Sequence, residues 1–252
     1  MIVASGVSKR YGDTLVVNDA TLELPARGIT AIIGPNGAGK STLLSMMARL
    51  IDMDAGRVTV DGLDVVTTPS DVLARRLAIL RQDNHITARL TVRDLVTFGR
   101  YPYSRGRPTA EDATHVARAL DYLNLTDLSH RFLDELSGGQ RQRAFVAMVL
   151  CQDTDYVLLD EPLNNLDMKH AATMMRLWRK AARDFHKTVV VVLHDINFAS
   201  WYADHIVAMR NGAICRQGTP TEIIRAEILR DIYEMEIGVH DIDGRRICMF
   251  YE

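Results

Sequence analysis

Apolar residues in the first part of the chain fall into short runs of strand length. Residues 14–33 alternate between apolar and polar positions in the manner of a strand pair, and they end in the apolar, largely β-branched run Ile29–Ile33. Such a run is typical of a strand that is buried on both faces of a sheet. A glycine-rich turn follows at once, and a helical pattern covers residues 41–50. The segment therefore predicts a strand, a tight turn and a helix in succession.

Two later apolar runs are similar to the first. They are Tyr156–Leu159 and Val189–Leu193, and each is followed by acidic or histidine residues. Strand, turn and helix recur at the spacing of βαβ units, which is typical of α/β folds with a parallel sheet. We therefore predict an α/β fold with a mainly parallel sheet core and an N-terminal antiparallel β portion.

The stretch 85–150 has a different character. It holds few β-branched runs, and Thr109 stands before acidic residues and a helical pattern over 113–123, as a helix N-cap does. We predict a mostly helical subdomain at about 85–150. It would be inserted into a core subdomain formed by about 1–84 and 151–252, so that residues 1–252 form one domain. The charged tail 219–252 is expected to pack on the core.

Composition narrows the possible partners. The 252 residues contain 32 acids and 30 bases, a balance that gives no support for a nucleic-acid partner. Three cysteines lie far apart without a CxxC pair, which indicates reduced thiols. No apolar run approaches the roughly 20 residues that cross a bilayer, and the N-terminus lacks the order of a signal peptide. We expect a soluble protein whose membrane role, if any, depends on a partner.

The glycine-rich turn satisfies the complete P-loop pattern, with a buried strand before it and a helix after it. Backbone N–H groups of such a loop wrap phosphates, and the following helix favours the anion. Lys40 would reach the β- and γ-phosphates, Ser41 would bind Mg²⁺, and Thr42 would lie near the α-phosphate. The alternative is a glycine turn without a ligand. The loop predicts a P-loop NTPase (RecA-like) core that binds the phosphates of a nucleotide; its residues are Gly34, Pro35, Asn36, Gly37, Ala38, Gly39, Lys40 and Ser41.

Two adjacent carboxylates follow the buried run Tyr156–Leu159. The carboxyl ends of strands are where ligands bind in open α/β sheets. Asp160 would hold Mg²⁺, directly or through water, and Glu161 would act as the general base on the attacking water. The alternative is an acidic pair that caps the strand end. Beside a P-loop, the catalytic interpretation is favoured.

A second candidate anion site lies at Leu136-Ser137-Gly138-Gly139-Gln140, which opens an apolar helical run at 144–150. An ordinary capped helix start is the alternative. This pentapeptide, together with the P-loop and the acidic pair in the same order, closely resembles the ATP-binding-cassette family over nearly the whole chain.

The resemblance implies roles for further residues. Tyr11 would stack on adenine, although a core tyrosine is the rival interpretation. Gln82 would sense Mg²⁺ and water, and His194 would contact the γ-phosphate. Residues 164–167 correspond to the loop that faces a second subunit. The chain departs from the family at Leu163 and at the Asn164–Asn165 pair, positions to which we assign no ligand.

The family resemblance also implies a dimer. In the family the signature of one subunit, here Ser137, Gly138, Gly139 and Gln140, covers the ATP held by the P-loop of the other subunit. A soluble cassette ATPase of DNA repair or translation is an alternative, but such proteins tend to carry long coiled-coil insertions or two fused cassettes. A P-loop kinase and an exporter half explain the sequence less well.

The cargo is predicted from residues 96–103. This run resembles the ATPase subunits of iron–siderophore importers, whose relatives move haem, vitamin B12 and other metal chelates. In the family the region receives a helix of the permease, and Phe98, Tyr101 and Tyr103 beside Arg100 suit a docking surface. A locally packed loop is the alternative. The sequence thus predicts an importer ATPase at the cytoplasmic face of the membrane. It would bind a permease, and a substrate-binding protein would deliver the cargo to that permease.

Overall fold

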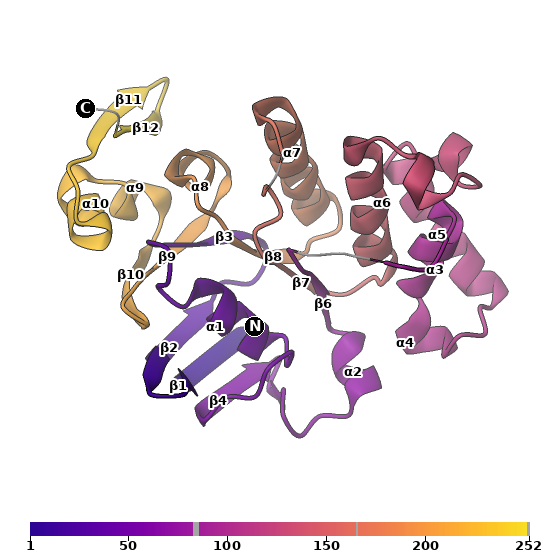
Figure 1. The fold of residues 1–252 in the computed structure, drawn as a ribbon, viewed down its shortest axis with the longest axis horizontal. Helices are drawn as coiled ribbons and strands as arrows, with labels where there is room; N and C mark the ends of the chain where they lie inside the picture. Colours follow the sequence, from indigo (N-terminus) through magenta and orange to yellow (C-terminus); the bar gives the residue numbers. More distant parts are fainter. Residues whose placement is uncertain (83–85, 165, 251–252) are drawn as a thin grey trace. The chain divides into compact units, whose positions relative to one another are not determined.

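The computed structural model describes residues 1–82, 86–164 and 166–250, and it divides into two compact units (Figure 1). The first unit contains Met1–Thr68 and Leu158–Glu252, and the second contains Pro69–Val157. No helix in the described part of the chain combines the length and the apolar character that crossing a bilayer requires.

An antiparallel sheet forms the N-terminal part of the first unit. Its order is β2-β1-β4-β5. Apolar positions of β2 such as Ala20 and Leu22 are buried while their neighbours are exposed, which explains the alternation in the sequence. The strands are β1 (Ile2–Tyr11), β2 (Thr14–Leu24), β4 (Ala55–Val60) and β5 (Leu63–Asp64).

The expectation that residues 14–33 form a strand pair is wrong. β2 pairs with β1, from Ile2 opposite Leu24 to Tyr11 opposite Thr14, whereas β3 (Gly28–Ile33) belongs to another sheet. The physical reason is burial. One face of β2 meets solvent, but β3 is buried on both faces and requires a layer on each side.

The parallel sheet of the first unit has β3 at its centre. Both β8 (Thr188–Val192) and β9 (His205–Arg210) pair with it in parallel, and β10 (Ala213–Gly218) pairs with β9 in antiparallel orientation. The predicted parallel core with an antiparallel N-terminal portion is confirmed.

Helices cover both faces of this parallel sheet. In Figure 1, α1 lies between the two sheets, and α7 and α8 lie on the opposite face. The side chain of Trp178 is fully buried there. The helices of the unit are α1 (Lys40–Met47), α7 (Met168–Asp184), α8 (Ile196–Tyr202), α9 (Pro220–Ile223) and α10 (Ala226–Tyr233).

The tail ends in a hairpin of β11 (Gly238–Ile242) and β12 (Arg245–Met249), which packs on α8. Asn197 accepts a hydrogen bond from the Cys248 N–H (2.7 Å) and donates one to the Cys248 carbonyl (3.2 Å). The Ser200 hydroxyl donates to the Arg246 carbonyl at 2.6 Å. The expected packing of the tail against the core of this unit is thereby explained.

The second unit is mostly helical. Thr109 and Asp112 form a capping box at the start of α5, as the sequence predicts for this helix. α3, α5 and α6 pack together around Leu95, Val116 and Leu120. The elements are α2 (Ser70–Ala74), β6 (Leu77–Leu80), α3 (Val92–Phe98), α4 (Tyr101–Ser104), α5 (Ala110–Tyr122), the 3₁₀ turns η1 (Thr126–Leu128) and η2 (Leu133–Glu135), α6 (Gly138–Cys151) and the start of β7 (Tyr156–Leu159).

The second unit extends beyond the predicted helical subdomain at both ends. The Gln152 side-chain amide donates to the carbonyls of Ala74 (2.7 Å) and Leu77 (3.3 Å), which ties the end of α6 to α2 and β6. Residues 69–82 and 151–157 therefore group with the helices. The functional subdivision at about 85 and 150 within one domain stays a prediction.

Candidate nucleotide site

The P-loop follows the carboxyl end of β3 and leads into α1. Two positions of the loop require glycine, because each has a positive φ and lies too close to a neighbouring backbone carbonyl for a side chain. Gly34 has φ 143°, and a Cβ there would lie 2.0 Å from the Met209 carbonyl oxygen. Gly39 has φ 91°, and its Cβ would lie 2.5 Å from the Val16 carbonyl oxygen. Because only glycine fits at these positions, the loop can wrap tightly enough for its N–H groups to face an anion.

A cavity of about 310 Å³ opens beside the P-loop. Its volume lies at the lower end of the range for small-molecule sites. The lining combines an anion-binding loop, a carboxylate and a histidine, which is a suitable set for phosphate chemistry. The lining residues are Val16, Asn36, Gly37, Ala38, Gly39, Lys40, Ser41, Thr42, Glu161 and His194.

Lys40 is 5% exposed, and its ammonium donates to the carbonyls of Gly34 (2.8 Å) and Pro35 (3.0 Å). Burial lowers the pKa of Lys40, whereas the carboxylates of Glu161 and Asp160 oppose this effect. A phosphate bound in the loop would add negative charge and favour the protonated ammonium further. The lysine is therefore held at the floor of the loop in a position to bind phosphate.

The carboxylate of Glu161 is fixed by several side chains. His194 Nε2 lies 2.7 Å from its Oε1, and the Ser41 hydroxyl lies 3.5 Å from the same oxygen. The Asn164 amide donates to Oε2 at 2.5 Å. Glu161 also has φ 49°, a left-handed conformation that is uncommon for a residue with a side chain. The site thus brings the predicted base, the predicted γ-phosphate histidine and the predicted Mg²⁺ hydroxyl together.

Asn164 is a site residue that the sequence analysis missed. The family resemblance marked it as a departure without a ligand, yet its amide contacts the predicted general base. The signal in the sequence that could have identified Asn164 is its spacing from the predicted base. Asn164 stands three residues after Glu161, and its N–H bonds to the Glu161 carbonyl at 3.2 Å in a turn. Its neighbour Asn165 lies outside the described residues.

The donor set fits Mg²⁺ carried by a nucleotide. Ser41 and Glu161 present oxygen atoms within 3.5 Å of each other, and Asp160 lies near enough to influence the Lys40 charge. Mg²⁺ is usually bound through one or two protein oxygens together with substrate phosphates.

Tyr11 ends β1 and does not line the cavity. Its side chain is 50% exposed, and the Lys9 ammonium lies 5.7 Å from the ring centroid. The rival interpretation of a core tyrosine is wrong, since the ring is exposed to solvent. An exposed ring beside a cation remains available for stacking on a base.

The predicted signature and Gln82 belong to the second unit. Ser137 is the N-cap of α6, and it forms a capping box with Gln140: the Ser137 N–H donates to the Gln140 side chain at 2.9 Å. Ser137 and Gly138 are exposed, and Gly139 follows them in the first turn of α6. Gln82 is exposed just after β6. Ser137, Gly138 and Gly139 thus present the N-terminus of α6 at the surface, as an anion site requires.

Residues 17–164 match the ABC transporter family. The chain belongs to this family. The cassette is 50% identical over 251 residues to the petrobactin import ATP-binding protein YclP of Bacillus subtilis (strain 168), covering 100% of both chains. It is 53% identical over 239 residues to the petrobactin import ATP-binding protein FatE of Bacillus anthracis, covering 95% of this chain and 96% of that protein.

A solved structure has the same fold. It is the dimeric structure of MJ0796, a bacterial ABC transporter cassette, with a TM-score of 0.75 and 29% identity over 87% of this chain and 99% of that one. The cassette is therefore an ATP-hydrolysing subunit of the ABC type, in agreement with the P-loop and the acidic pair.

The predicted docking segment folds as the end of α3 followed by α4. Phe98 is 51% exposed and Tyr101 is 60% exposed, so two of the expected aromatic anchors lie on the surface of the cassette. Both come from neighbouring turns of the chain. The second unit therefore carries an exposed apolar pair, a feature that is common in protein interfaces.

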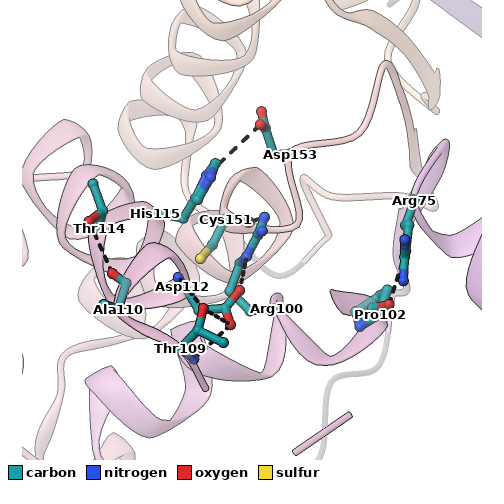
Figure 2. Close-up of polar contacts among 10 residues, drawn as sticks. All are labelled: Arg75, Arg100, Pro102, Thr109, Ala110, Asp112, Thr114, His115, Cys151 and Asp153. Atoms are coloured by element: carbon teal, nitrogen blue, oxygen red, sulfur yellow. Dashed lines mark hydrogen bonds and ion pairs between the residues drawn. The ribbon is translucent and has the colours of Figure 1, made fainter. Parts of the chain in front are cut away.

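The expectation that Arg100 contributes to this surface is wrong. Arg100 is 3% exposed, and its guanidinium lies 2.9 Å from the Asp112 carboxylate and donates to the Cys151 carbonyl at 3.1 Å (Figure 2). The guanidinium also stacks 3.8 Å from the Tyr103 ring centroid. Its charge is satisfied inside the second unit, because an unpaired buried charge would be costly. Arg100 supports the segment from within.

Proposed function

We propose that the cassette is the ATPase subunit of an importer for a ferric siderophore or a related iron chelate. The observation that carries this proposal is the cavity in which the P-loop, Lys40, Glu161 and His194 converge. The cargo is inferred from the relatives YclP and FatE, both of which are petrobactin import proteins.

In the proposed reaction, the P-loop N–H groups and Lys40 bind the phosphates of ATP. Glu161 accepts a proton from the attacking water, and His194 holds the carboxylate through its 2.7 Å contact with Oε1. Ser41, Asp160 and Gln82 are the residues that would hold Mg²⁺, which neutralises charge on the phosphates when it is bound.

The active form would be a head-to-tail dimer. Ser137, Gly138, Gly139 and Gln140 of one copy would cover the ATP held by the other copy, while Tyr11 would stack on adenine. Two observations support this arrangement: the exposed N-terminus of α6, and the dimeric state of the MJ0796 cassette. The dimer would close when it binds ATP and open after hydrolysis. It would thus switch between two conformations, and this change could do work.

The exposed pair Phe98 and Tyr101 would dock on the permease. The cassette would then lie at the cytoplasmic face of the membrane, and a substrate-binding protein would deliver the cargo to the permease. Aromatic anchors are typical of interface centres, and the buried Arg100–Asp112 ion pair would hold the segment that carries them.

Uptake of ⁵⁵Fe-labelled chelates tests the proposal. Deletion of the gene should abolish uptake of at least one ferric siderophore. Phe98→Asp should reduce this uptake by roughly tenfold or more, because loss of an interface anchor commonly costs about 2 kcal/mol. ATP binding by the purified variant should be unchanged.

The matched control is Val66→Asp, since Val66 is an exposed apolar residue (59%) in the other unit. It should leave uptake intact. Normal uptake of every ferric siderophore in the deletion strain, with loss of haem or vitamin B12 uptake, would reject the siderophore cargo. No transport defect of any kind would favour a soluble, non-transport ATPase.

A further inference from the structure

A second cavity, of about 560 Å³, lies in the first unit at the amino end of β3. It is lined by Gly28 and Ile29, which begin β3, by the C-terminal half of α7, and by Asp204 before β9. The P-loop follows the opposite end of the same strand. Six residues at about 3.3 Å each separate the two ends by about 20 Å, so this cavity is distinct from the nucleotide site.

The lining is strongly cationic. It contains five arginine and lysine side chains and one histidine, whereas Asp204 is its single carboxylate among the residues that the structure describes. The cassette as a whole carries slightly more acids than bases, 32 against 30. The cations are therefore concentrated here. They are Arg27, Arg176, Arg179, Lys180 and Arg183, with His186 beside them.

Helix α7 contributes four of these cations from one face. They stand at spacings of three and four residues, so Arg176 faces Lys180 and Arg179 faces Arg183 across single helical turns. Like charges at this spacing destabilise a helix. The only acid of α7 is Asp184 at its last position, and its carboxylate lies 3.4 Å from Arg183 Nε. An anion between these side chains would relieve the repulsion.

The one carboxylate in the cavity is already engaged. Asp204 Oδ2 accepts the Ile29 N–H at 2.8 Å, and its Oδ1 lies 3.8 Å from the Arg179 guanidinium. Arg179 itself donates to the carbonyls of Trp201 (3.2 Å) and Tyr202 (2.9 Å). This pair anchors the wall of the cavity. Arg27 and Arg176 line the open space with exposed side chains, and so does Arg183, whose Nε also lies 3.4 Å from Asp184 Oδ1.

The backbone at Arg27, on the rim of the cavity, has a left-handed conformation. Arg27 has φ 65°, and its N–H donates to the Thr188 hydroxyl at 2.8 Å. Left-handed backbone is uncommon for a long side chain, and such positions cluster at ligand sites. Gly28 next to it cannot carry a Cβ, which would lie 2.6 Å from Asp204 Oδ2.

We propose that this cavity binds a multivalent phosphate ligand. Arginine presents a planar fork of N–H donors that matches phosphate oxygens, and the cavity volume is that of a small-molecule site. The phosphates come either from a free small molecule or from a lipid headgroup. Both share the same recognition chemistry.

Titration calorimetry of the ADP-saturated cassette with inorganic tripolyphosphate tests the proposal, because ADP keeps the probe out of the P-loop. The test variant is Arg176→Gln/Arg183→Gln, whose side chains are exposed and do not hold the wall. Tripolyphosphate should bind the variant at least about tenfold more weakly, because loss of a single hydrogen bond to a charged group weakens binding by about that factor. ADP affinity should not change.

The matched control is Arg225→Gln/Arg230→Gln, which removes two exposed arginines elsewhere in the same unit. A parallel arm measures sedimentation with phosphatidylcholine vesicles that contain or lack phosphatidylglycerol. Loss of tripolyphosphate binding in the test variant alone supports a free ligand, and loss of phosphatidylglycerol binding in it alone supports a lipid headgroup. Equal binding by wild type, test variant and control in both arms, or no binding at all, overturns the proposal.

Discussion

The side-chain amide of Asn164 donates a hydrogen bond of 2.5 Å to Oε2 of Glu161. The other oxygen of this carboxylate faces His194 at 2.7 Å. Both oxygens of the proposed base therefore have a fixed partner, and the Asn164 contact comes from the segment that the family places against a second subunit. A shift of that segment would be transmitted directly to the carboxylate.

Replacement of Asn164 should lower the turnover number more than it changes the KM for ATP, because the residue orients the base and does not line the nucleotide cavity. We expect Asn164→Ala to reduce kcat by about threefold to tenfold, the value of one hydrogen bond of about 1 kcal/mol. Asn164→Asp should be worse, since a second carboxylate repels Glu161. Steady-state ATPase assays check this. Equal rates in the aspartate and alanine variants would show that the contact does not act on the base.

Glu161→Gln should bind ATP but hydrolyse it about 10²–10⁴-fold more slowly, because the amide keeps the shape and removes the proton acceptor. The variant should then accumulate as an ATP-bound dimer in light scattering. Adding Lys40→Ala to it should restore the monomer, since the ammonium that binds phosphate is gone. A Glu161→Gln variant that hydrolyses ATP at the wild-type rate would remove Glu161 from the role of base.

Ser137→Arg should block hydrolysis by obstructing the phosphate held by the partner copy. When this variant is mixed with Lys40→Ala, one interface of a hybrid dimer carries both lesions and the other carries neither. Random pairing would put about half of the molecules in hybrid dimers, each with one active interface out of two. We therefore expect partial return of ATPase activity in the mixture, up to about a quarter of the wild-type value. Activity that stays at the level of the separate variants at every mixing ratio would contradict the shared site.

Asp112→Asn should destabilise the second unit by about 3–5 kcal/mol at pH 7, because it leaves Arg100 buried without its counter-charge. The Thr109 N–H and the Arg100 guanidinium hold the pKa of Asp112 below its ordinary value. A depressed pKa means that the folded state prefers the ionised carboxylate. Its stabilisation is complete above the unfolded value of about 4 and is lost as the pH falls through the folded pKa.

Urea unfolding of wild type and variant between pH 7 and pH 3 measures this difference. The gap in stability should be constant above about pH 5 and should narrow at lower pH. Asp71→Asn is the control, because Asp71 also pairs with an arginine, Arg105, at 3.0 Å but on the exposed surface. Its effect should be much smaller and should fade in high salt. A gap that widens on acidification would contradict the assignment.

Local pattern predicted the strands of the core well. The run at Tyr156–Leu159 coincides with β7, because strands that are fully buried tolerate no polar interruption. The capping signal at Thr109 located α5 for a similar reason: a side chain that bonds its own helix start leaves a local trace in the sequence. The P-loop could also be predicted from the sequence, because a side chain at Gly34 or Gly39 would clash with the neighbouring backbone.

Non-local relationships were beyond the sequence. Alternation at 14–33 shows that β2 has one exposed face, but it does not say that the partner is β1 and that β3 joins another sheet. Arg100 reads as a surface cation, since arginine is rarely buried, and its burial depends on Asp112 and the Cys151 carbonyl from two other helices. The Asn164 contact depends on a left-handed turn at Glu161 that no residue type announces.

The amide of Asn197 and the hydroxyl of Ser200 occupy main-chain groups of β12 that a further strand would otherwise bond. Two side chains of a helix thus take the place of a sheet neighbour along this edge. An open strand edge is a template for pairing with other chains, and proteins protect such edges by covering them. The terminal hairpin of the cassette is consequently shielded along β12 from edge-to-edge aggregation, and Asn197→Ala/Ser200→Ala would expose that template without altering any residue of the hairpin itself.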